Sequence, residues 1–313
     1  MKDILASYDR AMLRDGWLFG DKGCRIGNPF AWTESERKGI TDLEGLRALL
    51  FFYKMYYVEP QDFIEIDRDV LLRVGKGMLD VIRQYLPFAD VSNNISCQAL
   101  ARAQDYAVIK AHCGDTFLSH VDVGPGLGAS VLWEYGENYT AVEASPMSYG
   151  VQRLFYRGQR EYEDTIVCED FGEKPLVSAE ILHVPSWNFH LVRDDSADLV
   201  TATFVLNELN YAGILWILCN ISRITTKGGY VYIRDSDILK PGMHDISYDK
   251  ALIDMGFECT YRLKYTNRHD YFGIPRVYRK ATEKVYTFET LVDKYLGKHM
   301  TVSGWDEFKY NEE

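Results

Sequence analysis

A glycine-rich stretch at residues 121–130 constrains the fold more than any other part of the chain. Apolar residues typical of a strand run directly into Gly124, Gly126 and Gly128, and a helix-like segment follows. Glycine allows the backbone to turn sharply and lets a ligand approach with no Cβ in the way. This order of strand, glycine turn and helix predicts the first βαβ unit of a parallel α/β sheet, with a ligand at the turn.

The chain beyond residue 117 alternates short apolar runs with helical segments, which is typical of a parallel α/β sheet. The last two apolar runs have no helix between them, so we expect an antiparallel pair at the end of the sheet. We expect strands at residues 118–123, 139–142, 180–184, 198–203, 230–234, 259–264 and 276–280, and helices at 128–135, 147–157, 205–225 and 247–255.

The first third of the chain differs from this pattern. Apolar residues there recur at helical spacing, for example at Val70, Val74 and Met78, and no strand-like alternation occurs. Glycine and proline residues break the region into about four helices. We therefore expect two units, a helical one at residues 1–105 and an α/β one at residues 106–313.

An acidic residue, Glu143, ends the second predicted strand, twenty-one residues after Asp122. That separation matches the length of one βαβ unit and places the Glu143 carboxylate where a ribose diol would bind. The spacing therefore predicts a ligand that contains a nucleoside.

Two classes of nucleoside ligand fit this pattern. Gly124, Gly126 and Ala129 match the dinucleotide fingerprint of NAD(P)-dependent oxidoreductases, in which a pyrophosphate lies on a helix N-terminus. Gly128 together with Asp122 instead fits S-adenosylmethionine, which carries an ammonium and a sulfonium and no phosphate. A carboxylate two residues before the first glycine repels pyrophosphate and attracts the positively charged methyl donor. The charge favours the methyl donor, and the oxidoreductase stays open as a second hypothesis.

The two motifs together resemble those of a known family. Residues 122–128 and 141–145, which read DVGPGLG and AVEAS, are similar to motifs of class I S-adenosylmethionine-dependent methyltransferases, and the resemblance extends over about residues 106–280. It implies a Rossmann-like sheet of seven strands with the last strand inserted antiparallel. It also implies S-adenosyl-L-methionine as cofactor and S-adenosyl-L-homocysteine as product. Within this class, the helical first third and the Asn-Glu-Leu at 207–209 resemble sugar O-methyltransferases.

Ligands in such sheets bind at the carboxyl ends of the strands, so the residues there are the candidates for cofactor binding. The acidic residue that the family usually has after its third strand is missing. Ser186 can accept the hydrogen bond of the adenine amino group instead, and Trp187 either stacks on the ring or covers the sheet edge. Thr203 and Phe204 are expected to flank the methionine part of the donor. The expected cofactor-binding residues are Asp122, Gly124, Pro125, Gly126, Gly128, Glu143, Ala144, Ser186, Trp187, Thr203 and Phe204.

Methyl transfer to a hydroxyl needs a base that takes the proton as the new C–O bond forms. His244, in a loop after the fifth strand, and Glu208, near the start of a helix, are the candidates. The charge of Glu208 also suits a helix N-terminus on dipole grounds alone. His183 is a further candidate, whereas His120 lies inside the first strand and is expected to be structural.

Asp235 completes the set of expected catalytic residues. Together with Asp237 it offers two carboxylates that could hold Mg²⁺, and a bound metal lowers the pKa of a hydroxyl. Because the two residues alternate along an extended segment, their side chains point to opposite sides as readily as to one site. We therefore predict no metal ligands, and Mg²⁺ stays possible but not favoured.

The composition of the chain limits the kinds of partner and the compartment that we expect. The chain has 35 Lys and Arg against 46 Asp and Glu, and the net charge of −11 opposes binding to a nucleic-acid backbone. The apolar runs are far shorter than the roughly 20 residues that span a bilayer, and the N-terminus has no signal-peptide pattern. The six cysteines contain no Cys-x-x-Cys pair, which suits a reducing compartment. We expect a cytoplasmic protein without a membrane span, and its oligomeric state is not predicted.

The predicted activity is transfer of a methyl group to a hydroxyl of a sugar, a glycan precursor or another small polyhydroxylated acceptor. The helical unit is expected to cap the donor cleft and to select the acceptor. Two more hypotheses stay open besides the oxidoreductase. One is N- or C-methylation of a non-sugar small molecule, and the other is a non-catalytic binding module with the same fold.

Overall fold

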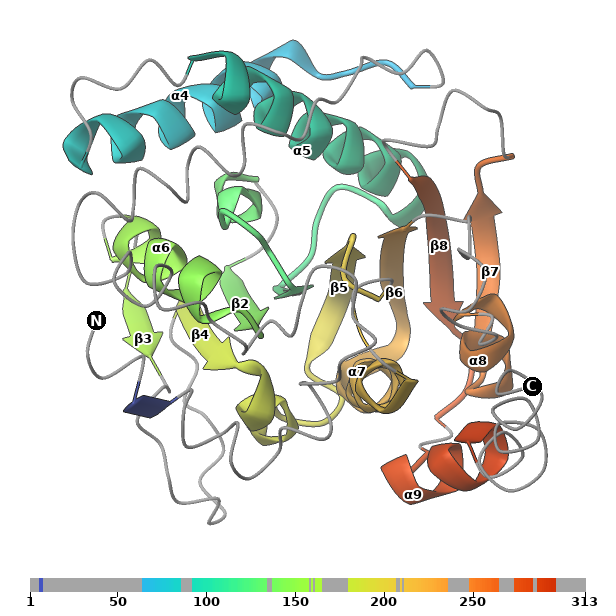
Figure 1. Ribbon diagram of the computed structural model, residues 1–313. Coiled ribbons are helices and arrows are strands. Elements are labelled where there is room, and N and C mark those ends of the chain that lie inside the picture. The colour runs from blue at the N-terminus through green and yellow to red at the C-terminus, as the bar shows by residue number, and fades with distance from the viewer. Residues whose placement is uncertain are drawn as a thin grey trace, which may run out of the picture.

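The computed structural model of the chain describes residues 6–7, 64–85, 92–133, 137–157, 159, 161–164, 180–206, 209, 211–235, 248–264, 273–283 and 286–296. Every structural statement below concerns these residues. The helices are α4 (Arg68–Tyr85), α5 (Ser92–Cys113), η2 (Ala129–Leu132), α6 (Pro146–Tyr156), η3 (Ser186–Leu191), α7 (Tyr211–Ile224), α8 (Tyr248–Asp254), α9 (Phe288–Leu291) and η6 (Val292–Leu296). The strands are β1 (Ser119–Val123), β2 (Asn138–Glu143), β3 (Tyr162–Asp164), β4 (Ile181–Pro185), β5 (Ala197–Thr203), β6 (Thr225–Asp235), β7 (Phe257–Arg262) and β8 (Ile274–Lys280) (Figure 1).

The eight described strands form one sheet in the order β3-β4-β2-β1-β5-β6-β8-β7 (Figure 1). Strands β1 to β6 run parallel to one another, whereas β8 is antiparallel to both of its neighbours, β6 and β7. The predicted antiparallel pair at the end of the sheet is therefore confirmed. The insertion of the last strand between two earlier ones also agrees with the arrangement that the resemblance implies.

The expected number of seven strands was wrong by one. Strand β3 pairs in parallel with β4 at the edge of the sheet, which makes eight strands. It is three residues long, its sequence is Tyr-Glu-Asp, and all three residues are half-buried. A short edge strand of this kind contains no apolar run, so the hydrophobic pattern on which the prediction rested could not reveal it.

Several elements differ in extent from the predicted ones, and α7 begins at Tyr211, six residues later than the helix expected at 205–225. Strand β6 begins at Thr225, five residues earlier than expected, because a polar segment that includes Gly228 at a φ of 82° continues the strand toward Ala197 of β5. The helix expected at 128–135 is only the four-residue 3-10 helix η2. The glycine turn is therefore followed by a single short turn of helix.

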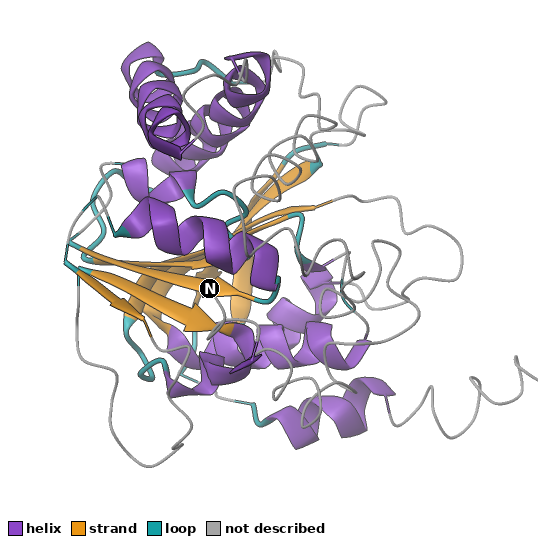
Figure 2. Ribbon diagram, turned by 60° about the vertical axis from the view of Figure 1, so that its left-hand side comes forward, coloured by secondary structure: helices purple, strands orange, loops and turns teal. Residues whose placement is uncertain are grey.

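Helices cover both faces of the sheet, as Figure 2 shows. Buried side chains alternate along the strands, and on β5 Leu199 belongs to the cluster with α4 and α5, whereas Val200 belongs to the cluster with α7 and α8. On β6, Tyr232 likewise belongs to the cluster with α4 and α5, and Val231 belongs to the cluster with α7 and α8. Strands buried on both faces are typical of a three-layer α/β fold, which confirms the predicted class.

Helix α5 brings the first part of the chain onto the sheet. It runs without a break from Ser92 to Cys113, so the boundary expected at residue 105 falls inside a helix. The helices expected before residue 60 lie outside the described residues, and the helical cap and the division into two units stay predictions. None of the described helices is both long enough and apolar enough to cross a membrane.

Candidate functional site

The loop after β1 is built from three glycines with left-handed backbone angles. The φ angles of Gly124, Gly126 and Gly128 are 63°, 62° and 78°, values that residues with a Cβ rarely adopt. The Gly124 N–H donates to the carbonyl of Val142 at 2.8 Å, and the Gly128 N–H donates to the carbonyl of Pro125 at 2.9 Å. The loop therefore turns sharply at the carboxyl end of β1 and is fixed to the end of β2.

The surroundings of the three glycines differ. A Cβ on Gly124 would lie 2.4 Å from Cγ2 of Val205, and a Cβ on Gly128 would lie 2.5 Å from the hydroxyl of Tyr156. Among the residues that the structure describes, no heavy atom would lie within 4 Å of a Cβ on Gly126. Two of the glycines are therefore required by packing inside the protein, whereas Gly126 borders open space that a ligand can enter.

The carboxylate of Glu143 lies beside this loop at the end of β2. Its Oε1 accepts the N–H of Ser145 at 2.7 Å, and its Oε2 accepts Nε2 of Gln152 at 2.7 Å. Burial raises the pKa of Glu143 to about 7, although these hydrogen bonds favour the ionised form. The Glu143 carboxylate is thus held at the end of β2, beside the glycine loop, by backbone and side-chain donors.

Gln152 of α6 connects Glu143 to the loop and to β4. Its Nε2 also donates to the carbonyl of Gly126 at 2.7 Å, and its Oε1 lies 2.9 Å from Nε2 of His183. Because the carbonyl and the carboxylate only accept, the NH₂ group of Gln152 must face them and its oxygen must accept from His183. His183 is thereby fixed with its proton on Nε2, and its Nδ1 accepts from the hydroxyl of Tyr162 at 3.0 Å.

The environment of His183 argues against its role as a base. Its ring is fully buried, stacks on Tyr149 at 3.6 Å, and has both nitrogens in hydrogen bonds. Burial, together with the charge of Arg153, holds the pKa of His183 well below its usual range. His183 is therefore a neutral residue that supports the glycine loop through its hydrogen bond to Gln152.

Asp122 is fully buried on β1, and neighbouring strands hold its carboxylate. Thr201 donates to Oδ1 at 2.8 Å, and Tyr139 donates to Oδ2 at 3.0 Å. Burial raises the pKa of Asp122, whereas the charge of Arg102 and these hydrogen bonds act in the opposite direction. Thr201 also accepts from Nε2 of His120, whose pKa burial lowers to about 3, so the expectation that His120 is structural fits its surroundings.

The end of β5 carries a residue with a strained backbone. Phe204 has a φ of 55°, which costs free energy for a residue with a Cβ. Its N–H donates to the carbonyl of Arg234 at 2.8 Å, and the Arg234 guanidinium lies 4.8 Å from the centre of its ring. The hydroxyl of Thr203 accepts Nη1 of Arg102 at 2.8 Å. These contacts hold Thr203 and Phe204 at the carboxyl edge of the sheet.

A buried ion pair fastens α5 to this edge. Asp105 of α5 accepts Nε and Nη2 of Arg234, the latter at 3.0 Å, and accepts the hydroxyl of Tyr232 at 2.6 Å. Asp105 and Arg234 are both fully buried. Sequence reasoning did not identify Asp105, Arg234, Arg102 or Gln152, because each has a partner at the site that lies 26 to 129 residues away along the chain.

The turn after β4 contains a polar group without a partner. The Oγ atom of Ser186 is buried and has no hydrogen-bond partner among the residues that the structure describes. An unpaired buried hydroxyl costs free energy that a bound ligand can recover. Trp187, the next residue, is 6% exposed within η3. Ala144 contributes its backbone N–H to Glu143, and its side chain is half-buried.

Of the predicted catalytic residues, Glu208 and His244 lie outside the described residues, as does Asp237. Asp235 is fully buried at the last position of β6, where a Cβ on Gly273 would come within 3.1 Å of its carbonyl group. Within the described ranges, no three His, Cys, Asp or Glu side chains are grouped so that they could hold a metal ion.

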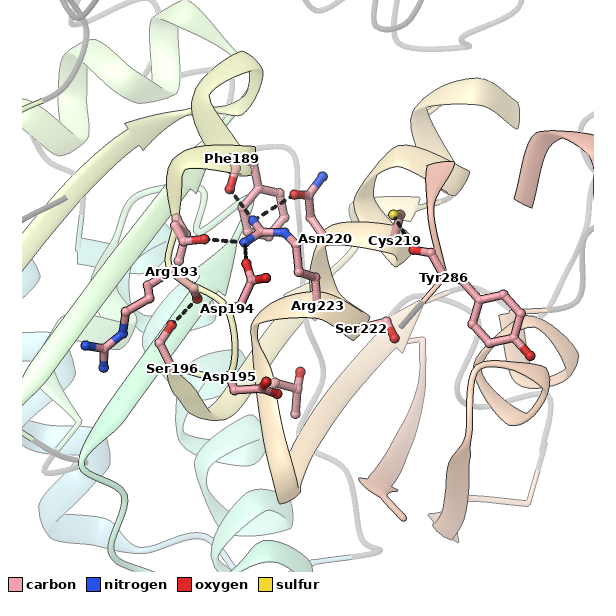
Figure 3. A network of polar contacts seen from close by, with 12 residues as sticks. Phe189, Arg193, Asp194, Asp195, Ser196, Cys219, Asn220, Ser222, Arg223 and Tyr286 are labelled. Atoms are coloured by element: carbon pink, nitrogen blue, oxygen red, sulfur yellow. Dashed lines mark hydrogen bonds and ion pairs between the residues drawn. The ribbon is translucent and has the colours of Figure 1, made fainter. Parts of the chain in front are cut away.

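A second polar network lies at the amino ends of the parallel strands, opposite to the candidate site (Figure 3). Arg223, near the end of α7, donates to the carbonyls of Phe189 and Val192 and pairs with Asp194. The N–H of Ser196, just before β5, donates to the carbonyl of the last residue of α7. Because ligands of parallel sheets bind at the carboxyl edge, we assign this network to the stability of the fold.

Comparison with known proteins found similarity in structure alone. No protein-family model matches the chain, and no curated protein matches it. A sarcosine dimethylglycine methyltransferase from Galdieria sulphuraria has 8% sequence identity and a TM-score of 0.44, with 61% of this chain and 89% of that chain covered.

Two further solved structures illustrate the similarity. The N-methyltransferase NodS from Bradyrhizobium japonicum WM9, solved with S-adenosyl-L-homocysteine, has 12% identity and a TM-score of 0.42, with 58% of this chain and 87% of that chain covered. The 1,6-didemethyltoxoflavin-N1-methyltransferase from Burkholderia thailandensis has 16% identity and a TM-score of 0.42, with 66% and 91% covered.

Proposed function

We propose that the protein binds S-adenosylmethionine at the carboxyl ends of β1, β2, β4 and β5 and transfers its methyl group to a small acceptor. The observation that carries this proposal is the loop after β1, where Gly126 borders open space next to the buried carboxylate of Glu143. The donor supplies a methyl group on a sulfonium. The protein's part is to bind the donor, to orient the acceptor in line and to remove its proton.

The residues at this edge fit the parts of the donor. Glu143 lies at the end of β2, where the ribose hydroxyls are expected, and the hydroxyl of Ser186, unpaired among the described residues, lies after β4, where the adenine is expected. Thr203 and Phe204 mark the end of β5 for the methionine part, and Asp122 contributes negative charge below the loop. All five belong to the cofactor-binding residues expected from the sequence.

A dinucleotide suits the same edge less well. A pyrophosphate draws its stabilisation from the N–H groups and dipole of a helix that begins at the glycine turn. The helix here is η2, a single 3-10 turn of four residues. The buried carboxylate of Asp122 adds repulsion toward phosphate. Both features favour the methyl donor over NAD(P).

The proposed acceptor is a hydroxyl of a sugar, a glycan precursor or another small polyhydroxylated molecule. The proposal rests on the resemblance to sugar O-methyltransferases in the first third of the chain and in residues 207–209. Glu208 and His244 are the proposed bases. Asp235 is the third candidate, but its complete burial makes proton transfer to it from an acceptor less favourable.

A thermal-shift experiment with S-adenosylhomocysteine and NAD tests the donor. Binding to the folded state raises the melting temperature, and we expect this effect from S-adenosylhomocysteine alone. A rise with NAD and none with S-adenosylhomocysteine would overturn the proposal. Transfer of a labelled methyl group to monosaccharides and sugar nucleotides, compared with amines, then tests the acceptor. Label only on the amines would contradict O-methylation while leaving the donor assignment intact.

A further inference from the structure

Arg102 of α5 is a cation at the carboxyl edge of the sheet that nothing in the sequence pattern had singled out. Its Nη1 donates to Oγ1 of Thr203 at 2.8 Å and lies 3.5 Å from Oδ2 of Asp105. The side chain is 12% exposed. The guanidinium is therefore held at the end of β5, largely shielded from solvent but not sealed off.

The guanidinium has donors to spare. An arginine side chain carries five N–H donors in a planar fork. Among the described residues, the polar contacts of Arg102 all use Nη1. Its Nε and Nη2 therefore remain for another acceptor, and a planar fork is suited to a carboxylate.

The neighbouring arginine does not offer the same capacity. Arg234 is fully buried, its Nε and Nη2 both donate to Asp105, and its face is covered by the ring of Phe204. Asp105 thus pairs mainly with Arg234 and lies farther from Arg102. Of the two guanidinium groups beside Asp105, that of Arg102 is the one closer to solvent.

Arg102 also lies near the end of β1. Its charge is close enough to Asp122 to favour the ionised form of that carboxylate. The fully buried Asp122 carboxylate and the partly exposed Arg102 guanidinium therefore lie at the neighbouring ends of β1 and β5. The amino-acid end of S-adenosylmethionine is a zwitterion with an ammonium and a carboxylate, which complements such a pair.

We infer that Arg102 binds the α-carboxylate of the methyl donor through its Nε and Nη2 donors and thereby makes the site specific for a donor with an intact amino-acid end. This inference rests on the proposed function. It assigns to α5 a direct part in donor binding, and it makes the buried pair of Asp105 and Arg234 the support that holds Arg102 at the strand ends.

The test compares S-adenosylhomocysteine with its decarboxylated analogue, which keeps the ammonium and lacks the carboxylate. We expect the full-length parent protein to bind S-adenosylhomocysteine at least about tenfold more tightly than the analogue, as measured by calorimetry. In Arg102→Met this preference should fall to less than about threefold, because only the carboxylate loses its partner. Arg83→Met, at an exposed position on α4, is the control and should keep the full preference.

Each outcome separates the inference from the proposed function. If the parent binds neither ligand, the proposed function fails. If the parent binds S-adenosylhomocysteine and Arg102→Met keeps the parent's preference, or loses affinity for both ligands equally, the inference fails and the donor site stands. If Arg102→Met does not fold, Arg102→Lys retains the charge and should keep part of the preference. Equal affinity of the parent for both ligands would overturn the inference without any variant.

Discussion

Gly124, Gly126 and Gly128 look equivalent in the sequence but meet different surroundings in the fold. All three have positive φ angles, so any other residue strains the backbone at each position. Of the three, Gly126 alone has no heavy atom of the described residues within 4 Å of the position of a Cβ. The sequence could predict that the turn needs glycine, but it could not tell which of the three has no close packing neighbour in the described part of the chain.

A comparison of Gly126→Ala with Gly124→Ala should therefore distinguish an effect on ligand binding from an effect on packing. We expect Gly126→Ala to lower the free energy of unfolding by about 1 kcal/mol, from the left-handed backbone alone, and to weaken S-adenosylhomocysteine binding about tenfold. Gly124→Ala adds the contact with Val205 and should cost about 2 kcal/mol or more in urea unfolding. Unchanged affinity in a folded Gly126→Ala protein would show that the ligand does not pass this residue.

The raised pKa of Glu143 predicts opposite pH trends for the stability of the protein and for its affinity for the donor. Burial raises its pKa from the usual 4.5 to about 7, so the folded state holds this proton more tightly than the unfolded chain does. The contribution of Glu143 to stability is therefore complete below about pH 4.5 and is lost as the pH rises through about 7. Donor affinity should rise over the upper part of this range, because ribose hydroxyls donate to the ionised carboxylate.

Glu143→Gln should flatten both trends, as followed by denaturant unfolding and by calorimetry with S-adenosylhomocysteine. Glu137→Gln, at an exposed position just before β2, is the matched control and should keep both. If donor affinity in the parent does not change between about pH 6 and about pH 8, the ionised form of Glu143 does not bind the ribose.

Single residues that act through distant partners could not be predicted. Glu143 and Asp122 could be, because their distance from the glycines along the chain is fixed by the βαβ unit. Gln152 and Arg102 could not, because their roles depend on where α6 and α5 pack on the sheet. Ser186 was predicted from its place after β4, and the structure adds that its hydroxyl has no partner among the described residues.

At the scale of elements, the strands with continuous apolar runs were predicted to within a few residues. β1, β2, β4 and β5 begin and end within one residue of the expected positions. The polar edge strand β3 was missed, and the strand expected at 230–234 left out the first five residues of β6. A continuous apolar run indicates a strand that is buried on both faces. The hydrophobic pattern therefore identifies central strands, but it does not reveal polar edge strands or polar extensions of a strand.

The junction between α5 and β6 should be a main source of stability for the described part of the chain. Asp105 accepts from Arg234 and Tyr232 in a buried environment, so Asp105→Asn leaves the Arg234 charge without its partner. We expect the free energy of unfolding to fall by about 3 kcal/mol. Asp80→Asn, exposed on α4, should change it by no more than about 0.5 kcal/mol in the same urea titration. A loss below about 1 kcal/mol for Asp105→Asn would show that this pair does not fasten α5.

At the scale of the whole molecule, several of the charged side chains of this acidic chain are gathered at the carboxyl edge of the sheet. Asp122, Glu143 and Asp235 lie buried at strand ends, and Asp105 lies buried beside them, whereas Arg102 and Arg234 supply the opposite charge. The order of strands places these groups along one edge of the sheet, although they come from residues 102 to 235 of the chain. Composition alone argued against a nucleic-acid partner but could not reveal this pairing.

The central claim is that the carboxyl edge of the sheet binds S-adenosylmethionine across the glycine loop. A crystal structure of the protein with S-adenosylhomocysteine tests it most directly. We predict the ligand beside Gly126, with its ribose hydroxyls on Glu143, its adenine near Ser186 and its α-carboxylate on Arg102. Density for the ligand at any other place, or a structure in which Glu143 and Gly126 do not contact it, would contradict the account.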